Sequence, residues 1–120
     1  MNPSRLLYVA TWLCVTALIV LSLLPGELRP HTGMEGRLEH FIAYAITGLI
    51  ATWAYRMPVR AVVGLALLSC VMELLQIYVP FRTAAVLDAV ASSLGGAVGS
   101  GIGLLVSAAF ARSELWKRCA

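Results

Sequence analysis

The chain has 120 residues, of which 60% are hydrophobic and only 12% are charged, with a formal net charge of +3. Soluble domains usually contain about 25% charged residues, so this composition argues against a soluble globular domain. It also argues against nucleic-acid binding, because the basic residues form no continuous patch along the sequence.

Four apolar runs predict four transmembrane helices with short connections. A helix needs about 20 apolar residues to cross a typical bilayer. We expect the helices at about residues 6–24, 38–55, 59–79 and 84–110, within a single domain that covers residues 1–120. The first run is longer than the apolar part of a signal peptide and lacks an Ala-x-Ala cleavage site, so we expect it to be retained. The predicted fold class is all-α, an integral membrane bundle.

The basic residues near the helix ends predict the orientation of this bundle. With four spans, both termini lie on one side, and that side holds six basic residues: Arg5, Arg56, Arg60, Arg112, Lys117 and Arg118. The other side holds Arg29, Arg37 and Arg82. Because cytoplasmic segments carry an excess of Lys and Arg, both termini are predicted to be cytoplasmic. Residues 25–37, which include His31 as a solvated loop residue, then face outward.

The second and third predicted helices carry polar residues near their outer ends. Tyr44 follows His40 by four residues, so the two side chains share one face of the second helix. Glu39, beside them, also suits the positive end of the helix dipole. Glu73 and Gln76 are three residues apart on the third helix and likewise share a face. A charge such as Glu73 near the bilayer centre costs about 2.5–3.5 kcal/mol, less near the interface, and calls for a partner, water or a proton.

The fourth predicted helix combines a polar start with a ridge of small residues. Asp88 and Ser92 are four residues apart and lie on one face. Gly95, Gly99 and Gly103 then repeat at every fourth residue, a spacing that lets two helix backbones approach closely. We predict that this ridge packs helices together, within the chain or between subunits.

An antiparallel bundle brings the outer ends of the last three helices together in one polar layer. Its members are Glu39, His40, Tyr44, Glu73, Gln76, Arg82, Asp88 and Ser92. One interpretation is a structural network in which Arg82 pairs with Asp88 or Glu73. The other is an outward-facing pocket for a polar head group, in which Arg82 binds an anion and His40 or Glu73, the candidate catalytic residues, exchange protons.

Metal and cofactor chemistry has little support in the sequence. Glu39, His40, Glu73 and Asp88 offer oxygen and nitrogen ligands. However, there is a single histidine among them, and no HExxH-type pair fixes a geometry. The three cysteines show no CxxC or Cys/His spacing. We therefore predict no metal and no cofactor.

The spacing of these polar residues resembles the VanZ-like family of small bacterial membrane proteins. Residues 36–44, GRLEHFIAY, are similar to the family pattern D-K-x-x-H-F-x-x-Y. A later helix of the family carries E-x-x-Q, here Glu73 and Gln76, followed by P-x-R, here residues 80–82. An aspartate comes six residues after the arginine, as Asp88 does here.

The resemblance covers residues 22–103 and has three departures. Gly36 replaces the usual aspartate, Ala85 stands where serine is common, and Ser92, three residues before Gly95, stands where asparagine is common. These changes remove one carboxylate and shrink two hydrogen-bonding groups. Six polar residues of the pattern remain: His40, Tyr44, Glu73, Gln76, Arg82 and Asp88.

The resemblance implies a role in the cell envelope, in the cytoplasmic (inner) membrane of a bacterium. The namesake of the family is associated with low-level resistance to teicoplanin, a glycopeptide antibiotic. The leading hypothesis is binding of an anionic lipid or lipid-linked head group at the outward polar pocket. One alternative is a membrane-embedded acid–base enzyme that acts on a lipid-linked envelope precursor. The other is a structural protein that uses the glycine ridge to bind a partner protein or a second copy of the chain.

Overall fold

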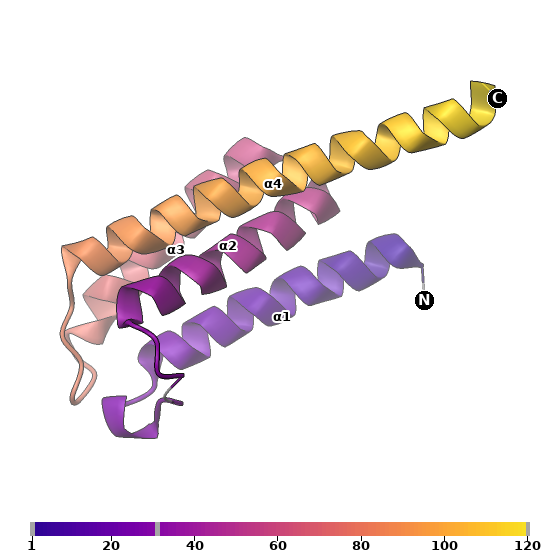
Figure 1. Ribbon diagram of the computed structural model, residues 1–120. Coiled ribbons are helices and arrows are strands. Elements are labelled where there is room, and N and C mark those ends of the chain that lie inside the picture. The colour runs from indigo at the N-terminus through magenta and orange to yellow at the C-terminus, as the bar shows by residue number, and fades with distance from the viewer. Residues whose placement is uncertain (1, 31, 120) are drawn as a thin grey trace.

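The computed structural model describes residues 2–30 and 32–119, with side chains up to Glu114; His31 lies outside the described residues. Its four long helices are α1 (Pro3–Leu23), α2 (Gly36–Tyr55), α3 (Pro58–Gln76) and α4 (Val86–Cys119). A single turn of 3-10 helix, η1 (Gly26–Leu28), follows α1. The described residues form no strand. The predicted all-α bundle is confirmed, and both termini lie at the same end of it (Figure 1).

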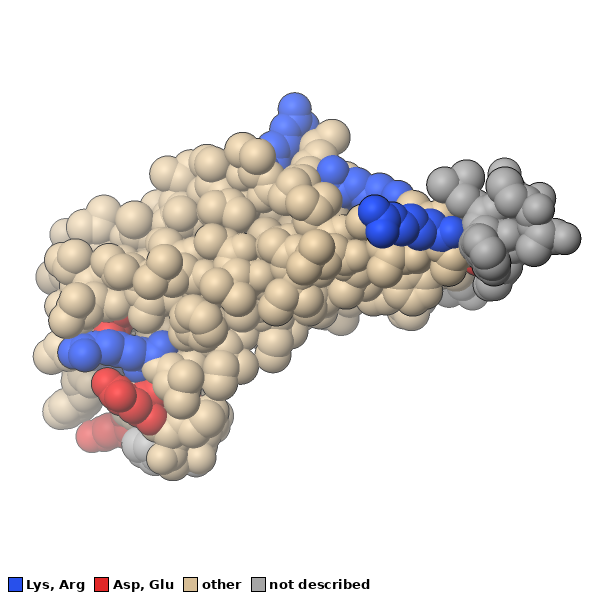
Figure 2. Space-filling model, turned by 45° about the horizontal axis from the view of Figure 1, so that its top comes forward, with Lys and Arg blue, Asp and Glu red and all other residues tan. Residues whose placement is uncertain are grey.

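Three of these helices are long and apolar enough to cross a membrane, namely α1, α3 and the Val86–Glu114 part of α4. The chain is therefore a membrane protein. The remaining predicted span, α2, has 20 residues but opens with Arg37 and Glu39, and it is not among the three. It packs against all three other helices. On the face shown in Figure 2, charged side chains gather near the two ends and leave an uncharged band between them.

Two helix ends differ from the sequence prediction for local reasons. The third helix ends at Gln76, because residues 77–81 form a tight turn in which Phe81 has a φ of 58°. The fourth helix does not end near residue 110 but continues to Cys119. Residues 111–119 contain neither glycine nor proline, so nothing in them breaks a helix.

The glycine ridge of α4 lies directly against the backbone of α2. A Cβ atom added to the glycine would lie 2.2 Å from a carbonyl oxygen at Gly95, 1.8 Å at Gly99 and 2.6 Å at Gly103. The three oxygens belong to every fourth residue of α2: Phe41, Ala45 and Leu49. No side chain fits at these contacts, so the spacing of the glycines fixes how α4 crosses α2.

The interior of the bundle is lined by small hydroxyl residues, and large apolar residues face outward. Thr47 and Ser100 are only 2% and 1% exposed, whereas Leu67 is 63% and Leu105 is 70% exposed. The Thr47 hydroxyl donates to the Ala43 carbonyl oxygen of its own helix (2.9 Å), which satisfies it without a partner on another helix. This distribution suits a protein whose outer surface meets lipid.

Candidate functional site

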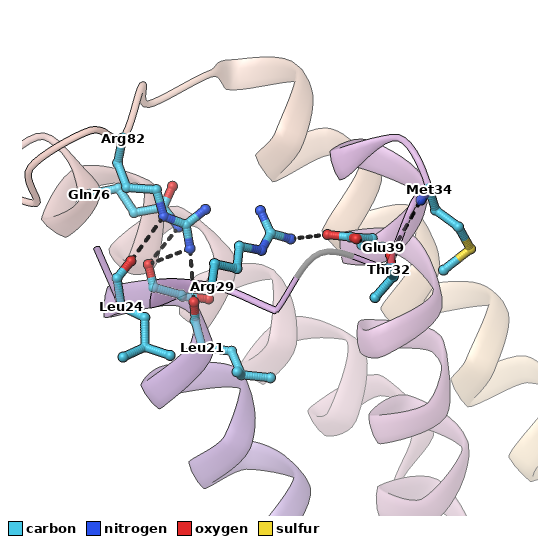
Figure 3. Close-up of polar contacts among 9 residues, drawn as sticks. Leu21, Leu24, Arg29, Thr32, Met34, Glu39, Gln76 and Arg82 are labelled. Carbon is cyan, nitrogen blue, oxygen red and sulfur yellow. Dashed lines mark hydrogen bonds and ion pairs between the residues drawn. The ribbon is translucent and has the colours of Figure 1, made fainter. Parts of the chain in front are cut away.

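The C-terminal end of α1 is held by side chains from α3 and the turn that follows it. The Nη2 atom of Arg82 donates to the carbonyl oxygens of Leu21 (2.8 Å) and Ser22 (3.0 Å), and its Nε atom donates to that of Leu24 (3.3 Å). The Gln76 amide also donates to the Ser22 carbonyl oxygen, at 3.1 Å (Figure 3). The last carbonyls of a helix have no partner within it, so these donors complete α1. We call this arrangement the carbonyl clamp.

The clamp corrects one of the two interpretations of Arg82, the structural network in which it pairs with Asp88 or Glu73. Among the described residues, Arg82 forms no ion pair with Asp88 or Glu73, because its donors are directed at α1 instead. Its Nη1 atom has no hydrogen-bond partner within the described chain. Burial and the nearby guanidinium of Arg29 lower the pKa of Arg82, while nearby carboxylates act in the opposite direction. An arginine nevertheless keeps its charge at neutral pH.

A second polar group joins the loop after α1 to the start of α2. Arg29 forms an ion pair with Glu39, and the Thr32 hydroxyl donates to the other oxygen of the same carboxylate. The backbone N–H of Met34 donates to the Thr32 hydroxyl at 3.3 Å. Sequence reasoning placed Glu39 in the site but did not single out Arg29. Arg29 could have been found, because Glu39 lies at the end of a predicted span and needs a cation from a neighbouring loop.

A third polar group brings together one residue from each of the last three helices. His40 on α2, Glu73 on α3 and Asp88 on α4 each place a ligand-type atom within 4.8 Å of the other two. Glu73 is only 9% exposed, and its Oε2 atom accepts a hydrogen bond from the Ala85 N–H at 2.9 Å. Asp88 lies 3.6 Å from the Nε atom of Arg37, which is half exposed.

The remaining predicted site residues are buried beside these groups. Tyr44 is 1% exposed and lies one turn after His40 on α2. Ser92 is 2% exposed and lies one turn after Asp88 on α4. The predicted layer is thus three adjoining groups of contacts: the carbonyl clamp, the Arg29–Glu39 pair and the triad of His40, Glu73 and Asp88.

A cavity of about 280 Å³ lies between α1 and α2, next to the clamp. Its inner walls are aliphatic, from Leu18, Leu21, Ile42 and Ile46. Its outer end is polar and is formed by Arg29, Glu39, His40 and Arg82. We call it the amphiphilic cavity, because one end suits a charged group and the other suits a hydrocarbon chain.

A second, more polar cavity of about 490 Å³ adjoins the amphiphilic cavity at the loop end of the bundle. The two share Arg29, Glu39 and Arg82, and the second also reaches Thr83 and Asp88. Both arginines therefore line both cavities, and Figure 3 shows the Arg29 guanidinium directed at Glu39 and the Arg82 guanidinium directed at the end of α1. Two cations facing one space, one with an unpaired Nη1, can hold an anion between them.

Comparisons with known proteins found no relative of this chain. No protein-family model, no curated protein and no solved structure matches the chain.

Proposed function

We propose that the protein binds an amphiphile with an anionic head group, such as an anionic lipid or a lipid-linked precursor, in the amphiphilic cavity. The observation that carries this proposal is the composition of that cavity. Arg29 and Arg82 stand at its outer end, and the side chains of Ile42 and Ile46 continue inward along α2. A head group can meet the guanidinium groups while its chain lies against the aliphatic wall.

The resemblance to VanZ-like proteins supplies the wider setting of this proposal. It points to the outer face of a bacterial inner membrane and to a link with glycopeptide tolerance. The positions of Arg29 and Arg82 at the end of the bundle away from the two termini support an outer-leaflet head group. The alternative of a partner protein docked on the glycine ridge has less support, because that ridge is occupied by α2 of the same chain.

Native mass spectrometry of the gently extracted protein tests this function. Phosphatidylglycerol and phosphatidylcholine are added in equal amounts, so that head-group charge is the variable. We expect selective retention of phosphatidylglycerol and about a tenfold loss of that retention in Arg29→Gln, since a hydrogen bond to a charged group contributes about 1.5–3 kcal/mol. Arg60→Gln removes an exposed arginine at the other end of the bundle and is the matched control.

Two further variants separate a binding site from a general loss of charge. Glu39→Gln removes the carboxylate that competes for Arg29, so it is expected to strengthen retention of phosphatidylglycerol. Ile42→Trp fills the aliphatic wall and is expected to weaken retention without changing any charge, whereas Leu67→Trp on the outward face of α3 is its control. Equal retention of both lipids in all of these proteins would refute the proposal.

A further inference from the structure

One imidazole and two carboxylate side chains converge between α2, α3 and α4, beside the amphiphilic cavity. His40 offers an imidazole nitrogen, and Glu73 and Asp88 each offer a carboxylate oxygen. All three atoms lie within 4.8 Å of one another. The convergence is a product of the tertiary fold, because the residues are 33 and 15 positions apart in the sequence.

The negative charge of this triad is only partly balanced by the groups around it, because Arg37 pairs with Asp88 but no cation pairs with Glu73 among the described residues. Glu73 is more than nine-tenths buried and forms no ion pair within the described chain. Its Oε2 atom is held by the Ala85 N–H, and its Oε1 atom has no hydrogen-bond partner among the described residues. Arg82, a cation that acts on Glu73, donates its hydrogen bonds to the carbonyl clamp instead. Two adjacent carboxylates, one of them buried, need a positive charge between them.

We infer that His40, Glu73 and Asp88 bind a divalent transition-metal ion, for which Zn²⁺ is the best fit. Zinc accepts imidazole nitrogen and carboxylate oxygen at about 2.0–2.2 Å. A tetrahedral site with such bonds places the ligand atoms about 3.4 Å apart. Side-chain rotations that move each ligand atom by about 1 Å would bring the three atoms to this spacing around the ion. Mg²⁺ and Ca²⁺ fit less well, because they take oxygen ligands and have little use for the imidazole.

The surroundings of the triad resemble those of metal sites that keep one position open. The Ala85 N–H orients the Glu73 carboxylate, and Arg37 lies against Asp88 on the exposed side. His40 also lines the amphiphilic cavity, and Asp88 lines the second cavity. Three protein ligands leave a fourth position, which both cavities can reach. This inference departs from the sequence prediction of no metal, because the sequence contains no short-range pair of ligands that signals the site.

Metal titration of the purified full-length chain in detergent tests the inference. The protein is first freed of metal with a chelator and then titrated with ZnCl₂ against a fluorescent zinc indicator. We expect one Zn²⁺ per chain and a loss of affinity of at least about 100-fold in His40→Ala and in Glu73→Gln, since even loss of an outer partner costs about 10–100-fold. His31→Ala, which removes the other histidine, and Glu35→Gln, which removes an exposed carboxylate, are the controls and should bind as the unmodified chain does.

A spectroscopic measurement keeps the test valid if a variant folds poorly. Co²⁺ in place of Zn²⁺ should give the strong visible absorption of a four-coordinate site with one imidazole ligand, in the unmodified chain itself. Absence of one-to-one Zn²⁺ binding by the unmodified chain would overturn the inference, as would equal affinity in Glu73→Gln and Glu35→Gln. Lipid retention is measured on metal-free protein, so failure of the metal site leaves the head-group proposal standing and the reverse also holds.

Discussion

The buried amide of Gln76 donates a hydrogen bond to the main-chain carbonyl oxygen of Ser22, 3.1 Å away and 54 positions earlier in the chain. Arg82 donates to the same oxygen at 3.0 Å. Among the described residues, α1 packs against α2 and α3 and does not contact α4. The carbonyl clamp therefore secures the helix that packs least extensively on the others, and with it one wall of the amphiphilic cavity.

Replacement of Arg82 should loosen α1 specifically. Arg82→Gln removes three donated hydrogen bonds, and we expect the free energy of unfolding to fall by about 1.5–3 kcal/mol, the range for hydrogen bonds of charged groups. Arg82→Lys should recover only part of this loss, because an ammonium group has no planar fork of donors. Hydrogen–deuterium exchange of the backbone amides should become faster near residues 21–24. Unchanged exchange there, in a variant that is otherwise folded, would contradict a clamp.

The matched control for this experiment is Arg60→Gln. Arg60 is exposed near the opposite end of the bundle, so its loss removes the same charge from the chain without touching α1. We expect its unfolding free energy to stay within about 0.5 kcal/mol of the unmodified protein.

A pair of glycines on α4 allows a controlled test of the α2–α4 contact. Gly99→Ala places a Cβ atom 1.8 Å from the Ala45 carbonyl oxygen, and we expect a loss of at least about 1–3 kcal/mol from overpacking. Gly101→Ala makes the same change two residues later, where nothing lies within 4 Å. It should be neutral or stabilise the helix by up to about 1 kcal/mol.

Denaturation of the two glycine variants, followed by circular dichroism in the same detergent, gives the comparison. Because both variants carry the same side chain on the same helix, the difference in helix propensity between glycine and alanine cancels. A Gly99→Ala protein as stable as Gly101→Ala would show that α2 and α4 do not meet at Gly99.

The parts of the fold that depend on patterns within one helix could be predicted from the sequence. Apolar runs of spanning length predicted the helices, and the four-residue repeat of Gly95, Gly99 and Gly103 marked a surface for close helix packing. The end of α4 was misplaced because residues 111–119 are polar enough to leave the bilayer yet contain no helix breaker. The hydropathy pattern indicates where α4 leaves the hydrocarbon, near residue 110, whereas the helix itself ends at Cys119.

The polar contacts were harder to predict, because they depend on which backbone a side chain meets. Residue spacing and the antiparallel arrangement of the helices grouped Glu73, Gln76 and Arg82 at one end of the bundle, where the structure also has them. The sequence offered carboxylate partners or an anionic head group for Arg82, whereas its donors meet the carbonyl oxygens at the end of α1. Every residue has a main-chain carbonyl oxygen, so the sequence does not indicate which of them a side chain will contact. Arg29 was overlooked for a related reason: its role depends on the path of an irregular loop.

The Arg29–Glu39 pair should show energetic coupling. Both side chains are less than a quarter exposed, so the pair is shielded more than a surface ion pair. A double-mutant cycle with Arg29→Gln and Glu39→Gln is expected to give a coupling energy of about 0.5–3 kcal/mol in the free energy of unfolding. The same cycle with Glu35 in place of Glu39 should give about zero, since Glu35 does not pair with Arg29. Additive effects in both cycles would show that the contact contributes nothing.

The orientation of the chain can be measured with single cysteines in a background that lacks Cys14, Cys70 and Cys119. Thr83→Cys lies exposed in the turn before α4, and Ser113→Cys lies exposed near the other end of that helix. The excess of basic residues on the side of the termini predicts that this side is cytoplasmic and that Thr83 faces outward. Thr83→Cys should therefore react with a membrane-impermeant maleimide on intact cells. Ser113→Cys should react only after the cells are permeabilised. The reverse pattern would place the amphiphilic cavity on the cytoplasmic side and would move the search for its head group to the inner leaflet.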